Sequence, residues 1–123
     1  MLRDPSACRD WGSAPDFVRA FVAAAEAPPG DFVVATGTLH ALGEIAHWAL
    51  AEAGAPDAEV RSSGAPPRPH DVGREHPNLE GTRRALGWAP EVALREEVER
   101  MVRVAGRRLA TGVEHDTAYL GSV

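Results

Sequence analysis

Apolar positions in the first part of the chain follow the period of a helix and then form an unbroken run. The helical spacing predicts a helix that begins at Asp16 and ends before Pro28, with the Asp16 carboxylate capping the first-turn amides. Residues 32–35 are continuously apolar and partly β-branched, which predicts a buried strand that stops at Thr36 and Gly37. The helical positions are Phe17, Val18, Phe21, Val22 and Ala25.

A second helix is predicted over residues 42–53, with Gly54 in the left-handed position that follows a helix C-terminus. Its start is expected to be weakly capped, because Ala41 stands where Ser or Thr would form a capping box with Glu44. Its apolar face consists of Leu42, Ile45, Ala46, Ala49, Leu50 and Ala53.

A loop rich in proline and glycine follows at residues 62–77, with one candidate for a short extended piece at residues 68–72. A loop of this length inside a small domain is usually functional or disordered. Asn78 is expected to cap a short helix that ends at Gly87, and residues 88–90 to form a turn.

The last predicted helix has the clearest apolar face of the four. Two oppositely charged pairs stand in the favourable i, i+4 order on it, Glu96 with Arg100 and Glu99 with Arg103. The apolar face consists of Val98, Met101, Val102, Ala105 and Leu109. Residues 113–123 are polar and are expected to form a loose tail.

These elements predict an α/β protein, mainly helical, with one or two short strands. So few strands cannot make a sheet with two buried faces, which indicates part of a larger α/β arrangement. The chain has 123 residues, and its 22 Ala equal its Val, Leu and Ile together, so the core is expected to be thin. A thin core in one small domain indicates marginal stability or a packing partner that is missing.

Charge and cysteine content exclude several classes of function. With 13 Arg, no Lys and 18 acidic residues the net charge is −5, which excludes a general binder of nucleic-acid backbones. Cys8 is the one cysteine, so no disulfide or thiolate metal cluster is expected, and its thiol is interpreted as structural or incidental. No segment has the length and apolarity of a membrane helix or a signal peptide, so the expected location is the cytoplasm.

Two features that resemble catalytic or binding motifs do not have the required spacing. Residues 37–43 follow the predicted strand and precede a helix, but they lack both the closely spaced glycines of a dinucleotide loop and the Gly-Lys-Ser/Thr of a P-loop. The five histidines form no zinc motif, and His47 is expected to be solvated. These histidines are His40, His47, His70, His76 and His115.

Two arginines in rigid surroundings are the candidate binding residues. Arg9 stands in Arg-Asp-Trp-Gly, and Arg68 in Arg-Pro-His-Asp within the long loop. Two converging guanidinium groups can neutralise a diphosphate through bidentate hydrogen bonds. The alternative is that both are surface arginines in weak ion pairs with Asp10 and Asp71.

Several segments together resemble, in the same order, the C-terminal part of the GDP-mannose 4,6-dehydratase family. They are Arg-Asp-Trp-Gly-Ser-Ala-Pro-Asp-Phe-Val at residues 9–18, Asp-Phe-Val-Val-Ala-Thr-Gly at 31–37, Arg-Pro-His-Asp-Val at 68–72, Leu-Gly-Trp-Ala-Pro at 86–90, and residues 97–102 and 111–120. The similarity runs from about residue 2 to residue 120. Each motif alone is weak evidence for the family, but the motifs taken together in this order are specific to it.

This resemblance implies a small domain that grips a nucleotide sugar and normally packs on an N-terminal Rossmann domain. In the family that other domain holds NADP and a Ser/Thr, Tyr-x-x-x-Lys and Glu set, which oxidises the sugar at C4, removes water across C5 and C6, and returns the hydride at C6. Arg9 and Arg68 inherit contacts with the diphosphate of a GDP-sugar. Asp71 stands where the family usually has Glu, so it inherits a substrate contact with a shorter reach.

The departures from the family pattern concern catalysis. The chain has no Lys, and its one tyrosine is Tyr119, so no Tyr-x-x-x-Lys pair exists in it. Gly73 and Asn78 also replace family acids in the long loop. Residues 1–112 are therefore predicted to be a nucleotide-sugar-binding domain of a fragmentary member, inactive by itself and without a cofactor of its own, and residues 113–123 its tail.

Other interpretations stay open. The same portion of another nucleotide-sugar epimerase or of a 4-keto-6-deoxy-sugar reductase is the nearest, although Trp11, Gly12 and residues 34–37 favour the dehydratase. A second is a non-enzymatic remnant that binds a partner through the face left bare by the missing domain. This remnant predicts association with a Rossmann-containing subunit or with a second copy of the chain. A third interpretation is that a separate chain supplies the NADP half in trans.

Overall fold

A computed structural model describes residues 1–66 and 76–112. Four helices and a two-stranded antiparallel sheet make up the described part, which confirms a mainly helical α/β chain. The elements are β1 (Cys8–Asp10), α1 (Ala14–Glu26), β2 (Leu39–Ala41), α2 (Leu42–Glu52), α3 (Glu80–Leu86) and α4 (Leu94–Thr111). None of these helices is long and apolar enough to span a membrane.

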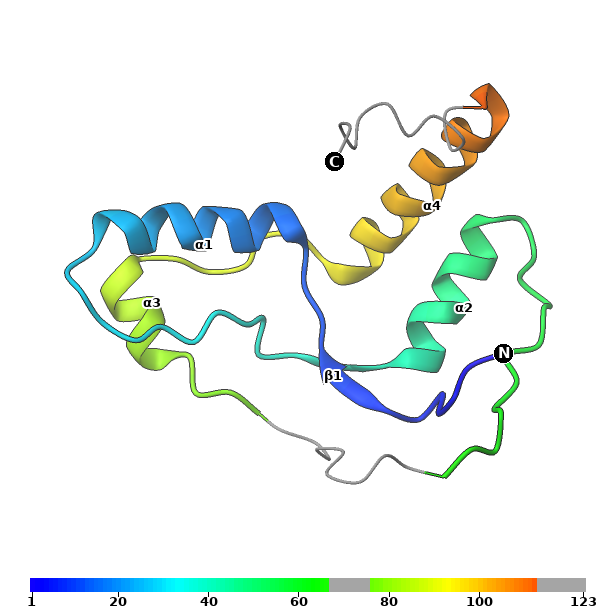
Figure 1. The fold of residues 1–123 in the computed structure, drawn as a ribbon, viewed down its shortest axis with the longest axis horizontal. Helices are drawn as coiled ribbons and strands as arrows, with labels where there is room; N and C mark the ends of the chain where they lie inside the picture. The colour runs from blue at the N-terminus through cyan, green and yellow to red at the C-terminus, as the bar shows by residue number, and fades with distance from the viewer. Residues whose placement is uncertain (67–75, 113–123) are drawn as a thin grey trace, which may run out of the picture.

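The helices form two pairs on either side of the strands (Figure 1). Helix α1 packs with α3 at one end, and α2 packs with α4 at the other. Strand β1 lies between the two pairs in Figure 1, and it pairs with β2 in the register Cys8 with Ala41, Arg9 with His40 and Asp10 with Leu39. The two-stranded β1–β2 sheet, called the ribbon below, therefore lies between the α1–α3 pair and the α2–α4 pair.

The strand predicted at residues 32–35 is wrong. This segment is irregular, and the second strand lies at Leu39–Ala41 instead. Backbone amides that would donate to a neighbouring strand donate to side chains instead. The Val33 amide donates to Thr82 Oγ1 at 2.9 Å, and the Thr36 amide to Asp10 Oδ1 at 2.8 Å. An apolar run specifies a strand only where another strand lies beside it.

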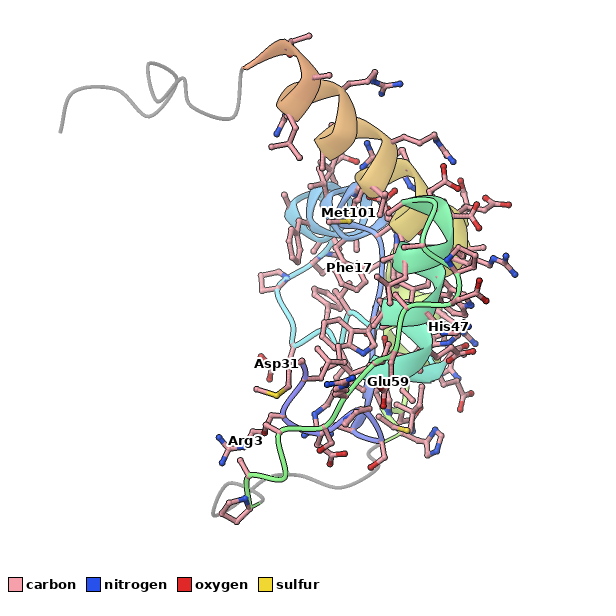
Figure 2. All side chains as sticks on the ribbon, turned by 90° about the vertical axis from the view of Figure 1, so that its right-hand side faces the viewer. Arg3, Phe17, Asp31, His47, Glu59 and Met101 are labelled. Atoms are coloured by element: carbon pink, nitrogen blue, oxygen red, sulfur yellow. The ribbon has the colours of Figure 1, made fainter. Side chains whose placement is uncertain are left out.

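The boundaries of the second helix are confirmed. Helix α2 begins at Leu42 after the uncapped Ala41, and Gly54 follows its C-cap with φ of 80°. His47 is exposed on the outer side of this helix, as predicted (Figure 2).

The start predicted for the first helix is wrong. Its N-cap is Ser13, and Asp16 is the third residue of α1. The helix ends at Glu26, before Pro28, as predicted.

The short third helix agrees with the prediction at its end and differs by two residues at its start. Gly87 is left-handed with φ of 59° and caps α3. The helix begins at Glu80, and Asn78 Oδ1 accepts the Glu80 amide at 3.0 Å, while Leu79 is the N-cap.

The ion pairs predicted along α4 are wrong, although the helix itself is confirmed. Arg100 pairs with Glu97, three residues earlier, and Arg103 pairs with Glu52 of α2 at 2.9 Å. The packing of α4 on α2 places Glu52 within reach of Arg103, which a pattern along one helix cannot reveal. The predicted apolar face is only partly used, since Val98 is buried whereas Met101 and Leu109 are exposed.

The core is as thin as the composition predicts. The buried apolar residues of the described part are Ala20, Ala35, Leu79, Trp88 and Val98. Trp88 is the one large aromatic ring among them, and it packs the segment after α3 against α1 through Phe17 and the Asp16 carbonyl.

Candidate functional site

The candidate site is built on the β1–β2 ribbon. Arg9 lies directly opposite His40, and cross-strand partners point to the same face of a sheet. Arg9 is half-buried, and its Nη1 donates to the Cys8 carbonyl at 2.7 Å. The register thus places Arg9 on the face of the sheet that carries His40.

Asp10 holds the Arg-Asp-Trp-Gly segment against the chain that leads into β2. Its Oδ1 accepts the Thr36 amide at 2.8 Å and the Thr36 hydroxyl at 2.9 Å, and its Oδ2 accepts the Gly37 amide at 2.6 Å. Gly12 permits this close approach, because a Cβ there would lie 2.8 Å from Thr36 Cγ2. Asp10 is therefore a structural anchor.

A pocket of about 520 Å³ lies where this segment meets the start of α4. Such a volume is within the range of small-molecule sites in proteins. Aromatic, hydroxyl and charged side chains all contribute to its wall. Its lining comprises Trp11, Thr36, Thr38, His40, Trp48 and residues 90–95.

His40 connects this pocket to the first turn of α2. Its Nδ1 lies 3.1 Å from Glu44 Oε2, and its ring meets that of Trp48 edge to face with centroids 5.4 Å apart. A hydrogen bond and a ring contact thus fix the imidazole in the pocket wall.

Asp16 orders the opposite wall of the pocket. It is only 1% exposed, and its Oδ2 accepts the backbone amides of Glu91 at 3.1 Å and Val92 at 2.9 Å, both of which line the pocket. Its Oδ1 accepts Nη2 of Arg19. The expected capping role is thus wrong, because the carboxylate accepts the backbone amides of the connection between α3 and α4 and not the first-turn amides of its own helix.

The environment of Asp16 favours the ionised carboxylate. Burial by itself raises the pKa of Asp16. Hydrogen bonds from Arg19, Val92 and Glu91, together with the Arg19 charge, lower the pKa by more than burial raises it, so the pKa lies below its ordinary value. The pKa of Glu97, also buried, is lowered by its hydrogen bonds to Arg100, against an opposing effect of burial. Two buried charges therefore support the start of α4.

Of the three residues predicted to bind substrate, the structure describes Arg9. Arg68 and Asp71 lie outside the described residues, as does the extended piece predicted at residues 68–72. Cys8 is half-buried, with Sγ 3.4 Å from the Ser6 carbonyl. In residues 1–66 and 76–112 no group of three His, Cys, Asp or Glu side chains is placed to hold a metal ion.

Sequence reasoning missed most of the pocket wall. His40 was considered only as a metal ligand, Trp48 was not singled out, and residues 90–95 were divided between a turn and a helix. The one signal for Trp48 is its position beside the apolar face of α2, four residues after Glu44 and eight after His40.

The described residues do not fit a dinucleotide phosphate. Residues 37–43 enclose the short strand β2, which continues directly into α2, so they form no glycine loop between a strand and a helix N-terminus. Residues 37–43 therefore do not fit the phosphates of the NADP that the family implies.

Comparison with known proteins agrees with the architecture. A family model described as GDP-mannose 4,6 dehydratase matches residues 2–101. GDP-mannose 4,6 dehydratase 2 of Caenorhabditis elegans is 33% identical over 119 residues, which cover 82% of this chain and 31% of that protein.

Solved structures share the fold. A Thermotoga maritima UDP-glucose 4-epimerase crystallised with UDP-glucose superposes with a TM-score of 0.75 at 26% identity, over 89% of this chain and 35% of that one. The Bordetella bronchiseptica enzyme WbmF in complex with NADH gives a TM-score of 0.72 at 22% identity, over 98% of this chain and 37% of that one. The chain spans about a third of the length of each of these relatives.

The fold and these matches define a member of the NAD-dependent epimerase/dehydratase class. The match over residues 2–101 and the identity with the nematode enzyme narrow this class further. The chain belongs to the GDP-mannose 4,6-dehydratase family.

Proposed function

We propose that residues 1–112 form the nucleotide-sugar-binding part of a GDP-mannose 4,6-dehydratase, with residues 113–123 as a tail. The observation that carries this proposal is the placement of Arg9 on the face of the ribbon that also presents His40 to the 520 Å³ pocket. A cationic strand residue beside a pocket of that size suits a ligand with a charged group and a bulky end.

The diphosphate of a GDP-sugar is the ligand group assigned to Arg9. A guanidinium offers paired N–H donors that match phosphate oxygens, and its position on a hydrogen-bonded strand lowers the entropy lost on binding. Arg68 and Asp71 are assigned to the same ligand on the resemblance to the family, with Arg68 as the second cation at the diphosphate.

The chain is proposed to bind the substrate without transforming it. Its sequence contains no Tyr-x-x-x-Lys pair, and the described residues form no cradle for NADP. In the full family protein, NADP bound outside this part takes and returns the hydride. What the present residues supply is the binding and orientation of the sugar nucleotide.

Arg9→Ala is expected to weaken GDP-mannose binding to the 123-residue chain by about 1.5 to 3 kcal/mol, or roughly 10- to 150-fold in Kd, because it removes charged hydrogen bonds to the diphosphate. Isothermal titration calorimetry measures this change. Arg84→Ala is the matched control, since Arg84 is an exposed arginine paired with Glu80 on α3, away from the pocket lining. Equal affinity of Arg9→Ala and the wild type would leave Arg9 a surface arginine, and binding of UDP-sugars alone would favour an epimerase or a reductase.

A second candidate function is the docking of a partner through an apolar face of α1. Val18, Phe21 and Val22 lie on one side of this helix and are all more than half exposed, with Phe21 at 61%. Val33, in the irregular segment that follows, is also half exposed. Exposed apolar side chains clustered on one helix face indicate an interaction surface, here for a Rossmann-type partner or a second copy of the chain.

Phe21→Arg is expected to reduce association of the chain with itself or with such a partner, because a charge placed in an apolar interface must be desolvated without a counter-ion. Sedimentation velocity over a range of concentrations measures self-association, and co-purification with a Rossmann-containing subunit measures the heteromeric form. Leu109→Arg is the control, since Leu109 is equally exposed but lies near the end of α4. A monodisperse wild-type monomer that captures no such subunit contradicts the docking function.

A further inference from the structure

Carboxylates stand in and beside the wall of the 520 Å³ pocket. Glu91 and Arg95 both line it, and Arg95 donates from Nε to Glu99 at 2.9 Å. A further carboxylate, that of Glu44, touches the wall, because its Oε2 lies 3.1 Å from Nδ1 of His40. The chain as a whole has a net charge of −5. An anionic ligand therefore enters a region in which a carboxylate without a counter-ion would repel it.

The Glu91 carboxylate is held from α1. Its Oε1 accepts Nη1 of Arg19 at 2.7 Å, and Arg19 is 72 residues earlier in the chain. The same guanidinium also bonds Asp16 Oδ1, and its Nη2 donates to the Ala89 carbonyl at 3.3 Å. Arg19 is not among the residues that line the pocket, so any effect it has there passes through Glu91.

Stability alone does not explain the contact between Arg19 and Glu91. The Glu91 side chain is 72% exposed and that of Arg19 is 43% exposed, and ion pairs between exposed side chains contribute little to stability. Asp16 already holds the backbone of residues 91 and 92 by accepting both of their amides. What the Arg19 contact adds is a fixed direction and a counter-ion for the one carboxylate in the pocket lining.

We propose that Arg19 is a positioning residue for the anionic ligand of this pocket, because it holds the Glu91 carboxylate toward α1 and compensates its charge. Without Arg19, Glu91 would be an uncompensated anion in the wall and would repel a diphosphate held by Arg9. The inference rests on the proposed function, since the diphosphate of a GDP-sugar is the group that makes this compensation necessary.

Calorimetric titration of the 123-residue chain with GDP-mannose tests this role. Arg19→Gln is expected to weaken binding about three- to tenfold at about 0.01 M salt, because Glu91 loses its counter-ion. The double variant Arg19→Gln/Glu91→Gln also removes the carboxylate, so its affinity is expected to return to within about twofold of the wild type. A loss of affinity caused by a misshapen wall would not be reversed by the second substitution.

Ionic strength separates charge compensation from a structural role. The range of electrostatic interactions falls from about 30 Å at 0.01 M salt to about 3 Å at 1 M salt. The ratio of the wild-type affinity to that of Arg19→Gln is therefore expected to approach one at the higher salt concentration, whereas a structural defect would persist at both.

The matched control is Arg84→Gln, alone and together with Glu80→Gln. These two residues form the same kind of ion pair, are both exposed, and lie on α3 outside the pocket lining (Figure 1). Neither control variant is expected to change the affinity for GDP-mannose.

Thermal melts show whether each variant is folded at the temperature of the titration. If Arg19→Gln is not folded, Glu91→Gln alone gives the test, because it keeps the ion pair of Arg19 with Asp16. It is expected to bind GDP-mannose about two- to fivefold more tightly than the wild type at about 0.01 M salt, since the wall loses a negative charge.

The outcomes separate this inference from the function on which it rests. If GDP-mannose binds in an Arg9-dependent way but Arg19→Gln binds like the wild type, or its loss persists at high salt or in the double variant, the role of Arg19 is overturned while the proposed function stands. An unchanged affinity of Glu91→Gln overturns the inference in the same way. If the wild-type chain does not bind GDP-mannose at either salt concentration, the proposed function is overturned and the inference with it.

Discussion

Asp16→Ala is expected to lower the free energy of unfolding by about 3 kcal/mol, because it removes a buried carboxylate that accepts three hydrogen bonds from charged or backbone donors. Arg19 would keep its partner Glu91 and access to water, since its side chain is 43% exposed, so the loss stays at the lower end of the range for broken buried ion pairs. Urea unfolding followed by circular dichroism measures the change.

The same interaction predicts a dependence on pH. Because the folded-state pKa of Asp16 lies below its ordinary value of about 3.9, its contribution to stability is fully present above that value. It is lost as the pH falls through about 3.9 toward the lower pKa of the folded state, where the folded protein also takes up the proton. The stability difference between the wild type and Asp16→Asn is therefore expected to shrink below about pH 4.

Asp57→Asn is the control for both measurements, because Asp57 is exposed in the loop after α2. A difference between the wild type and Asp16→Asn that stays constant from pH 7 to pH 3 would contradict a role for the ionised carboxylate. An Asp16→Ala variant as stable as the wild type would mean that the connection between α3 and α4 holds its position by packing alone.

Asp16 also illustrates where sequence-based prediction fails. The pattern around it is that of a helix N-terminus, and a helix does begin there, at Ala14. The partners of the carboxylate are 75 and 76 residues further along the chain, beyond any local signal. Local patterns predicted α2 and the end of α3 well because Gly54 and Gly87 encode the ends of their helices through their own backbone conformation.

The candidate site could be predicted only in part for the same reason. Arg9 was identified because its motif is contiguous, and Trp11 belongs to that motif. His40 reaches the site through the register of β1 with β2, and residues 90–95 reach it through the hydrogen bonds to Asp16. Tertiary contacts of this kind depend on the fold as a whole, so the spacing of residues along the chain does not predict them.

Residues 32–35 show the converse case, in which a strong local pattern for a strand does not produce one. The run has the composition of a buried strand, yet its Val33 amide donates to the Thr82 side chain of α3, and the Thr36 amide directly after the run donates to the Asp10 side chain of β1. Val33 of this run and the exposed face of α1 both present apolar side chains to the solvent. Their apolar character is consistent with the docking function proposed above.

Trp88→Ala is expected to cost about 3 to 5 kcal/mol of unfolding free energy, the largest effect of any substitution considered. The ring is 5% exposed and lies 6.5 Å from that of Phe17, and its Nε1–H is bonded to the Asp16 carbonyl. Alanine would leave a cavity between α1 and the segment after α3, in a core with few other large side chains. Since small domains have a total stability of roughly 5 to 15 kcal/mol, a substantial fraction of the variant is expected to be unfolded at 37 °C. Thermal melts followed by far-ultraviolet circular dichroism measure this.

The control is Trp11→Leu, which removes an accessible indole from the pocket wall and is expected to change the melting temperature far less. The comparison separates two positions of tryptophan, because Trp88 is buried in the core whereas Trp11 is accessible in the pocket wall. Trp88→Phe keeps most of the ring volume and loses the hydrogen bond to Asp16, so its loss of stability isolates the polar part of the interaction, about 1 kcal/mol. If Trp88→Ala and Trp11→Leu melted at the same temperature, Trp88 would not be the centre of the core, and the link between α1 and the start of α4 would depend on the Asp16 hydrogen bonds alone.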